Sequence, residues 1–361
     1  MIAVILVVCG IAYHVLAIIA ALRFRRHAVV PDFTPPVSIL KPVRGVDPQF
    51  YEAIQSHAEQ EYPAFELIFG TADPNDPARA EIEKLRAEHP AIPIRVIDTA
   101  NDAPNGKVGS LEILAGHAQH EVLLVNDGDI LVPSDYLQRV IGPLVDERVG
   151  MVTCLYTGRG SSVATMAEAI GIATEFAPSV LVARLISSSG FALGATMAFR
   201  ASDLKAIGGF AAIREYLADD YQLGARIAAL GKRVVLSDCV VQTSLGAGTW
   251  REVWKHQVRW SRTIRVSRTA GYFGYIVTQL TFWSIVAAAT GHRAIAELGL
   301  VVRLISAVLA MRALGFGSLA LLAPLRDLFG LAVWAAGMVG REVEWRGIRF
   351  RLLRDGRIRP L

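Results

Sequence analysis

The chain has 361 residues, of which 53% are hydrophobic, and a formal net charge of +4. Its mean hydropathy of +0.39 exceeds that of an ordinary soluble domain, so part of the chain is expected to contact lipid. The cysteines Cys9, Cys154 and Cys239 include no CxxC pair, which argues against a disulfide framework and a zinc site. The positive charge suits nucleic acid, anionic lipid or an anionic substrate, and the position of the basic residues has to decide among them.

Residues 1–22 form an apolar stretch without Asp, Glu, Lys or Arg, long enough as a helix to cross the hydrocarbon layer. Arg23, Arg25 and Arg26 follow directly, which predicts that this transmembrane helix enters the cytoplasm at its C-terminal end. A cleaved signal peptide is less favoured, because no basic region precedes the stretch and no clear small-residue cleavage site follows it.

Residues 35–248 alternate charges, prolines and short apolar runs with the rhythm of βα units, which predicts a cytoplasmic α/β domain. Its first strand pattern, at 37–40, ends at Lys41-Pro42. The second, at 65–70, is followed by Asp73, at a position where open α/β sheets bind nucleotides. A turn or helix-cap role is the alternative for Asp73.

A third strand pattern, at 121–125, ends in Asp127-Gly128-Asp129. Two carboxylates one residue apart on a glycine turn can face a hard divalent cation, which can in turn bridge a diphosphate. An ordinary surface turn is the alternative.

Asp219 and Asp220 then open a helical pattern. Acidic residues in a first turn are favoured by the helix dipole, but a carboxylate here could also be a general base.

Residues 249–270 combine several arginines with tryptophans, a pattern typical of an amphipathic helix in the headgroup region of a membrane. The same helix could hold Arg259 against a leaving pyrophosphate and Trp260 against an acceptor. An apolar zone at 271–340 predicts two crossings, near 272–290 and 294–312, and then a broken helix that is re-entrant or interfacial. Internal charges such as Arg303 leave a buried core helix as the alternative for each segment. The arginine-rich tail at 341–361 is predicted to be cytoplasmic.

In order and spacing, these acidic residues and the Arg-Trp pair resemble the D, D, D, (Q/R)xxRW series of inverting GT-A glycosyltransferases. More closely, the chain from Val37 onward resembles the ceramide glucosyltransferase family (glycosyltransferase family 21-like), including related bacterial hopanoid-associated glycosyltransferases. The shared segments are Ser38–Pro42, Gly45–Pro48, Asp73–Pro77, Lys107–Leu111, Asp220-Tyr221, Arg259-Trp260 and Trp345–Leu352. The resemblance implies a GT-A domain, Rossmann-like and of the nucleotide-diphospho-sugar transferase type, beside membrane helices at both ends.

The resemblance also implies residue roles. Asp73 would contact the uridine end of a UDP-sugar, and Lys107 would lie near the nucleotide. Asp127 and Asp129 would hold Mg²⁺ or Mn²⁺ on the diphosphate, and Asp220 would be the catalytic base. Arg259 and Trp260 would close the site. His256 stands where the motif has Gln or Arg, and Asp219 where a glutamate is usual, so Asp219 and Asp220 could exchange roles.

The implied reaction transfers a hexose, with inversion, from a UDP-sugar to the hydroxyl of a membrane lipid. Ceramide with UDP-glucose is the first expectation, and a bacteriohopane polyol with UDP-N-acetylglucosamine is the alternative. A polysaccharide synthase is less favoured because the membrane zone is small, and a silent sugar-nucleotide-binding protein because every carboxylate of the series is present. Nucleic-acid binding is not expected, since the arginines cluster beside apolar segments and no recognised motif is found. The alanine- and arginine-rich composition fits a multi-pass protein of a bacterial inner membrane.

Overall fold

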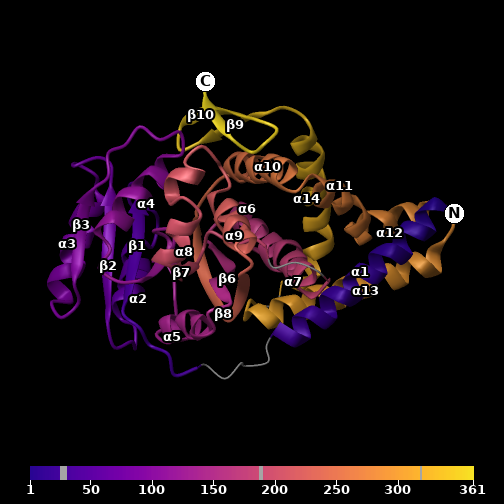
Figure 1. The fold of residues 1–361 in the computed structure, drawn as a ribbon. Helices are drawn as coiled ribbons and strands as arrows, with labels where there is room; N and C mark the ends of the chain where they lie inside the picture. The colour runs from indigo at the N-terminus through magenta and orange to yellow at the C-terminus, as the bar shows by residue number, and fades with distance from the viewer. Residues whose placement is uncertain (25–30, 187–189, 318) are drawn as a thin grey trace.

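The computed structural model describes residues 1–24, 31–186, 190–317 and 319–361. Within these ranges an N-terminal helix precedes an α/β domain, further helices follow, and a small β-sheet ends the chain (Figure 1). The α/β domain is built on one eight-stranded sheet with the strand order β3-β2-β1-β4-β7-β6-β8-β5.

Parallel strands form the first half of this sheet. They are β1 (Val37–Val43), β2 (Phe65–Thr71), β3 (Ile94–Asp98) and β4 (Val122–Val125). Both faces of β1 and β4 are buried, which explains why these strands have continuous apolar runs rather than alternation. The connecting helices are α2 (Phe50–Ala58), α3 (Ala78–Glu88) and α4 (Gly106–His117).

The second half of the sheet has mixed strand directions. β7 (Met197–Arg200) runs antiparallel between β4 and β6 (Val149–Gly160). β8 (Arg233–Gly246) is parallel to β6, and the short β5 (Ile130–Leu131) pairs antiparallel with β8. The remaining helices of the domain include α5 (Tyr136–Ile141), α8 (Ala201–Ala206), α9 (Asp219–Ala229) and the 3-10 turns Gly142–Val145 and Phe210–Ile213.

Inside the predicted 35–248 domain lies a long apolar helix that the sequence analysis did not identify. It comprises α6 (Val163–Gly171), a π-helical turn (Ile172–Phe176) and α7 (Ala177–Ile186). The helix is long and apolar enough to cross a membrane, but 61% of its apolar window is buried inside the protein. Because α7 packs against α1 (Ile2–Phe24), this helix joins the α/β domain to the membrane helices.

Among the described residues, three more helices meet the length and apolarity needed to cross a membrane: α1, α13 (Arg293–Leu314) and the segment Ala320–Met338. That last segment is a 3-10 turn, Ala320–Leu322, followed by α14 (Ala323–Met338). α11 (Thr269–Thr278) and α12 (Leu280–Ala289) form a pair bent by 45°. α1, α12 and α13 pack together and project from the domain, with the N-terminus at the far end of the bundle (Figure 1).

The other helices of this region lie against the α/β domain. α14 packs on α10 (Trp250–Ser267), the predicted amphipathic segment. The capping box of Thr249 and Glu252 fixes the start of α10, and α10 leads directly toward α11. Pro324 stands in the first turn of α14, where proline is tolerated because the first turn needs no N–H donor.

The predicted basic tail folds into an antiparallel sheet of β9 (Glu342–Trp345), β10 (Ile348–Leu352) and β11 (Ile358–Pro360). Phe350 and Leu352 are buried with Leu217 of the α/β domain, while the intervening Arg351 is exposed. β11 also contacts the loop before α9, where the Ile358 N–H donates to the Glu215 carbonyl at 2.7 Å. The C-terminal sheet therefore packs against the loop that precedes α9.

Candidate active site

Asp127 and Asp129 lie on the turn after β4, at the carboxyl edge of the parallel strands. The side chain of Asp127 is 41% exposed, whereas Asp129 accepts a hydrogen bond from the Thr243 hydroxyl of β8 at 2.5 Å. Burial, followed by the neighbouring charge of Asp127, raises the pKa of Asp129 to about 6. The two neighbouring carboxylates repel each other when both are ionised, so a cation bound between them would be stabilised.

A buried polar layer supports this turn from below. Lys41 of β1 donates to the Asn126 side-chain oxygen at 2.7 Å and to the Asp127 carbonyl at 3.1 Å. The Asn126 amide donates to Nε2 of His57 at 2.6 Å, and His57 Nδ1 donates to the Ala53 carbonyl. Burial lowers the pKa of Lys41 to about 7, although Asp129 and Asp127 oppose the shift. These bonds hold the Asp127 backbone in place.

Lys107 joins two of the candidate carboxylates. It stands in the first turn of α4, and its Nζ lies 2.9 Å from Asp127 Oδ1 and 3.2 Å from Asp219 Oδ2. Burial alone would lower the pKa of Lys107, but the two carboxylates outweigh burial and raise it above its ordinary value. The expectation that Lys107 lies in the site agrees with this geometry, and the same ammonium could contact a bound phosphate.

Asp219 and Asp220 open α9, as the sequence pattern predicts. The Asp220 carboxylate accepts the Gly194 N–H at 2.9 Å and the Tyr221 N–H at 2.7 Å. Burial, followed by the charge of Asp219, raises the pKa of Asp220 to about 6. A carboxylate held by two backbone donors, with a pKa near the physiological range, is suited to accept a proton.

The functional face of α10 carries His256, Arg259 and Trp260. His256 Nδ1 donates to Glu168 of α6 at 2.7 Å, and its ring lies 4.6 Å from that of Trp260. Among the described residues, the Arg259 guanidinium makes no hydrogen bond or ion pair, and it lines a cavity of about 330 Å³ between α10 and the C-terminal sheet. Burial lowers the pKa of Arg259 to about 10, against the effects of Glu168 and Asp127. Arg259 is thus a cation available to an anionic ligand.

A row of aromatic side chains, here called the aromatic wall, extends from α10 toward the candidate base Asp220. The ring of Trp260 lies 6.3 Å from Phe176 of the π-helical turn, and Phe176 lies 5.3 Å from Tyr156 of β6. Burial and, next, the charge of Asp220 raise the pKa of Tyr156 well above its ordinary value, so this phenol lies within the electrostatic influence of the Asp220 carboxylate. The wall therefore lies between α10 and Asp220.

Asp73 is the candidate that the structure leaves apart from the others. It is exposed after β2, and its Oδ1 accepts the Asn75 N–H at 2.8 Å, an Asx turn. In the described chain no hydrogen bond or ion pair joins Asp73 to another candidate residue. The nearby Asp76 instead accepts the Gly45 N–H at 2.9 Å and connects this loop with the end of β1.

Asp127 and Asp129 fit a divalent cation by the chemistry of their donors. Both supply carboxylate oxygens, the ligand type that Mg²⁺ and Mn²⁺ prefer. Burial and, next, the charge of Asp127 raise the pKa of Asp129. No group of three or more His, Cys, Asp or Glu able to hold a metal is found among the described residues. The remaining ligands would therefore come from a diphosphate and water, as is usual for Mg²⁺.

A comparison with protein families places this site. The model of Glycosyl transferase family 21 matches residues 2–358. The chain belongs to glycosyl transferase family 21. The predicted family is thus confirmed.

Curated relatives agree with the family. Ceramide glucosyltransferase 1 of Caenorhabditis elegans is 26% identical over 231 residues, which cover 62% of this chain and 49% of that protein. The ceramide glucosyltransferase of Komagataella phaffii is 30% identical over 125 residues, or 33% of this chain and 25% of that one. The matches thus span about half or less of the relatives' length.

Among solved structures, a mannosyltransferase from Pyrobaculum calidifontis in complex with GDP-Man and Mn²⁺ superposes with a TM-score of 0.57. The two chains are 20% identical, and the match covers 93% of this chain and 96% of the other. At this level of identity the likeness shows the fold, and it confirms the predicted GT-A class of the family 21 chain.

Sequence reasoning missed several residues of this site. Glu168, Tyr156 and Thr243 were not identified, and Lys41 was quoted only as part of a shared segment. Lys41 offered a usable signal, because a lysine within a buried strand pattern needs a polar partner. Glu168 and Tyr156 gave none, since the bond from Glu168 to α10 and the electrostatic influence of Asp220 on Tyr156 both connect residues distant in the sequence.

Proposed function

We propose that this family 21 protein is an inverting glycosyltransferase that moves a hexose from a UDP-sugar to the hydroxyl of a membrane lipid. The observation that carries the proposal is the position of Asp220: a carboxylate at the start of α9, held by two backbone N–H groups beside the Lys107 cluster. The aromatic wall near Asp220 includes Phe176, which belongs to a helix that is apolar enough to enter a membrane.

In this mechanism Asp220 accepts the proton of the acceptor's primary hydroxyl. The acceptor oxygen attacks the anomeric carbon, the bond from that carbon to the β-phosphate oxygen breaks, and UDP leaves with the bonding pair. Lys107 and Arg259 offset the charge that develops on the phosphates, which lowers the barrier by electrostatic stabilisation. Attack opposite the leaving group converts an α-linked donor into a β-glycoside.

Asp127 and Asp129 would hold Mg²⁺ or Mn²⁺, which when bound supplies positive charge to the donor diphosphate. Asp73 would contact the uridine end of the donor, and its exposed position after β2 leaves its carboxylate open to a ligand on one side. His256 and Trp260 would face the acceptor, with Glu168 fixing the orientation of the imidazole through its bond to Nδ1.

UDP-glucose and ceramide are the substrates that we propose first. Support comes from the curated relatives, which are named ceramide glucosyltransferases. Nothing in the comparisons favours the hopanoid alternative, a bacteriohopane polyol with UDP-N-acetylglucosamine, and it serves as the competing arm of the test.

We further propose that the protein is a multi-pass protein of a bacterial inner membrane, with its catalytic domain in the cytoplasm. The C-terminal end of α1, whose last turn contains Arg23, and the C-terminal sheet, which is rich in arginine, lie toward the α/β domain rather than at the far end of the helix bundle (Figure 1), as the positive-inside bias requires.

The test is a transfer assay with purified protein in detergent. Radiolabelled UDP-glucose and UDP-N-acetylglucosamine are each supplied with ceramide or bacteriohopanetetrol, with Mn²⁺ or with EDTA. Labelled glucosylceramide formed only with Mn²⁺ supports the proposal. Label on the hopanoid replaces the acceptor assignment, and an absence of labelled lipid in every arm rejects lipid glycosylation.

A further inference from the structure

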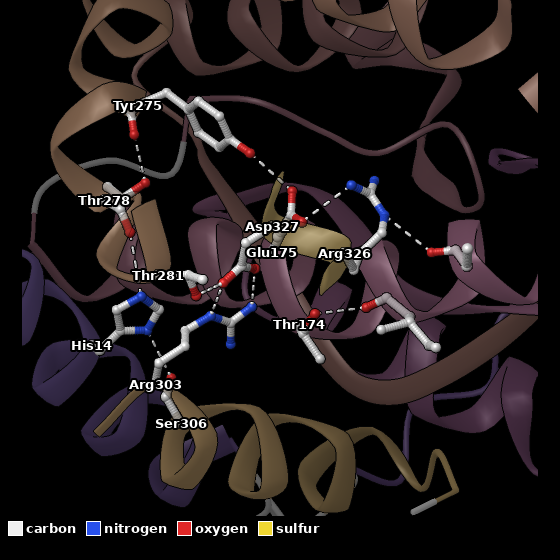
Figure 2. A network of polar contacts seen from close by, with 12 residues as sticks. His14, Thr174, Glu175, Tyr275, Thr278, Thr281, Arg303, Ser306, Arg326 and Asp327 are labelled. Carbon is white, nitrogen blue, oxygen red and sulfur yellow. Dashed lines mark hydrogen bonds and ion pairs between the residues drawn. The ribbon is translucent and has the colours of Figure 1, made fainter. Parts of the chain in front are cut away.

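A network of buried charges lies where the membrane helices meet the α/β domain. Arg303 of α13 donates to both oxygens of Asp327, at 2.8 and 2.6 Å, and the Thr281 hydroxyl donates to the same carboxylate. Next to this pair, Arg326 of α14 faces Glu175 of the π-helical turn at 3.2 Å (Figure 2). Charged side chains in apolar helices are costly and are usually retained for a function.

Arg326 differs from Arg303 because its other contacts reach the α/β domain. Its Nε donates to the Ala167 carbonyl at 3.0 Å, and its Nη2 donates to the Gln257 side-chain oxygen of α10 at 2.9 Å. The three nitrogens of the guanidinium thus connect α14 with the long helix formed by α6 and α7 and with α10. Arg303 makes no such bond to α10 among the described residues.

The chain leaves room for this arginine at two glycines. A Cβ on Gly171 would lie 2.3 Å from Nη2 of Arg326. A Cβ on Gly330 would lie 2.7 Å from a carboxylate oxygen of Glu175 and 2.9 Å from Nη1 of Arg326. The pair therefore occupies a space that side chains at these two positions would fill.

From Gln257 the contacts continue to the active site. The Gln257 amide donates to Glu168 Oε1 at 2.9 Å, and the same oxygen accepts the His256 Nδ1–H at 2.7 Å. His256 in turn packs against Trp260. The π-helical turn serves both ends of this chain of contacts, because Glu175 pairs with Arg326 and the adjacent Phe176 lies against Trp260.

We propose that Arg326 is a positioning residue for glycosyl transfer: through Gln257 and Glu168 it fixes His256 and Trp260 at the place where a lipid acceptor must meet the catalytic base. The inference rests on the proposed function for its kinetic readout, but the geometric link does not. Disconnecting Arg326 should misplace the aromatic wall and leave the proposed donor contacts on β4, α4 and α9 in place.

Two variants disconnect the link in different ways. Glu175→Gln with Arg326→Gln removes both charges, so that neither remains unpaired in the interior. Gln257→Leu removes the connection without touching a membrane charge, and it decides the question if the double variant does not fold. Arg303→Gln with Asp327→Asn is the matched control, because it removes a neighbouring buried ion pair that has no bond to α10.

Three readouts separate positioning from general damage. We expect both disconnecting variants to lower kcat/KM for the acceptor by about tenfold or more, since a small misplacement of a substrate-positioning group costs up to ~10²-fold. The dissociation constant for the UDP-sugar should change less than the acceptor kcat/KM, because Arg259 is the one proposed donor contact that lies on α10. The control variant should keep its acceptor kcat/KM within about twofold of the wild-type value. Hydrogen exchange should become faster in α10 peptides of the disconnecting variants alone.

The inference is overturned if both disconnecting variants keep wild-type acceptor kinetics, if they match the control, or if exchange in α10 does not change. Exchange does not require turnover, so it tests the link even where the wild-type protein transfers no sugar to a lipid. A wild-type protein that transfers no sugar to a lipid would reject the proposed function, and the Arg326 link would then be judged by exchange alone.

Discussion

Replacing Asp220, the proposed catalytic base, tests the mechanism at one side chain. Asp220 accepts two backbone hydrogen bonds, from Gly194 and Tyr221. An asparagine can accept one of them, while its NH₂ group faces the other donor and leaves it unpaired. The loss of that bond costs about 1–3 kcal/mol of folding free energy. A general base contributes about 10²–10⁴-fold to the rate, or about 2.7–5.4 kcal/mol of transition-state stabilisation.

Asp220→Asn should therefore lower kcat by at least about 10²-fold, while the affinity for the UDP-sugar changes little, because the Lys107 contacts to Asp127 and Asp219 remain. Transfer of labelled sugar gives kcat, and calorimetric titration with the intact UDP-sugar gives the affinity. Asp219→Asn is the matched control, since it changes the neighbouring carboxylate and should weaken donor binding more than turnover. Full turnover by Asp220→Asn would refute the assignment, and loss of turnover in Asp219→Asn alone would move the base to Asp219.

Three further predictions follow from the same geometry. Lys107→Met leaves Asp127 and Asp219 without their shared cation, so UDP-sugar affinity should fall by about tenfold or more, and unchanged binding in a titration would remove Lys107 from the donor site. The base must be ionised to accept a proton, and its pKa is raised to about 6, so kcat/KM should increase with pH through that value; a rate profile that is flat from pH 5 to 7 would contradict this. Gly224→Ala puts a Cβ 2.4 Å from the Ala192 backbone nitrogen, so α9 must shift, and both the melting temperature and transfer should decrease, which thermal unfolding and the transfer assay can check.

The strand ends could be predicted from the sequence because short apolar runs and the acidic turns after them are local features. The turn at Asp127 and the start of α9 at Asp219 both lie where these patterns place them. The order of the sheet could not be predicted, because β7 inserts antiparallel between β4 and β6. The local pattern of hydrophobic residues does not indicate which strands pair when they are far apart in the sequence.

The C-terminal sheet was missed for a different reason. Its arginines indicated a solvated tail, although Phe350 and Leu352 alternate with Arg349 and Arg351 as in a half-buried strand. That period of two was available in the sequence. The burial of Leu217 beneath it was not, since the two segments meet only in the folded chain.

The membrane helices show the limits of hydropathy. α13 follows the predicted apolar segment closely, but the helix from Val163 to Ile186 is apolar because it is buried against the membrane bundle and the sheet together. Arg326 carried no signal of its role in the sequence, because its partners lie 69 to 159 residues away along the chain. No local pattern reports contacts over such distances.

Identification of the lipid product tests the central claim most directly. Purified protein is incubated with UDP-glucose, ceramide and Mn²⁺. The extracted lipid is analysed by mass spectrometry and by the NMR coupling constant of the anomeric proton of its sugar. We expect glucosylceramide with a β linkage, formed by the wild-type protein and absent with Asp220→Asn. An α linkage would contradict the inverting mechanism, and free glucose with no glycolipid would contradict a lipid acceptor.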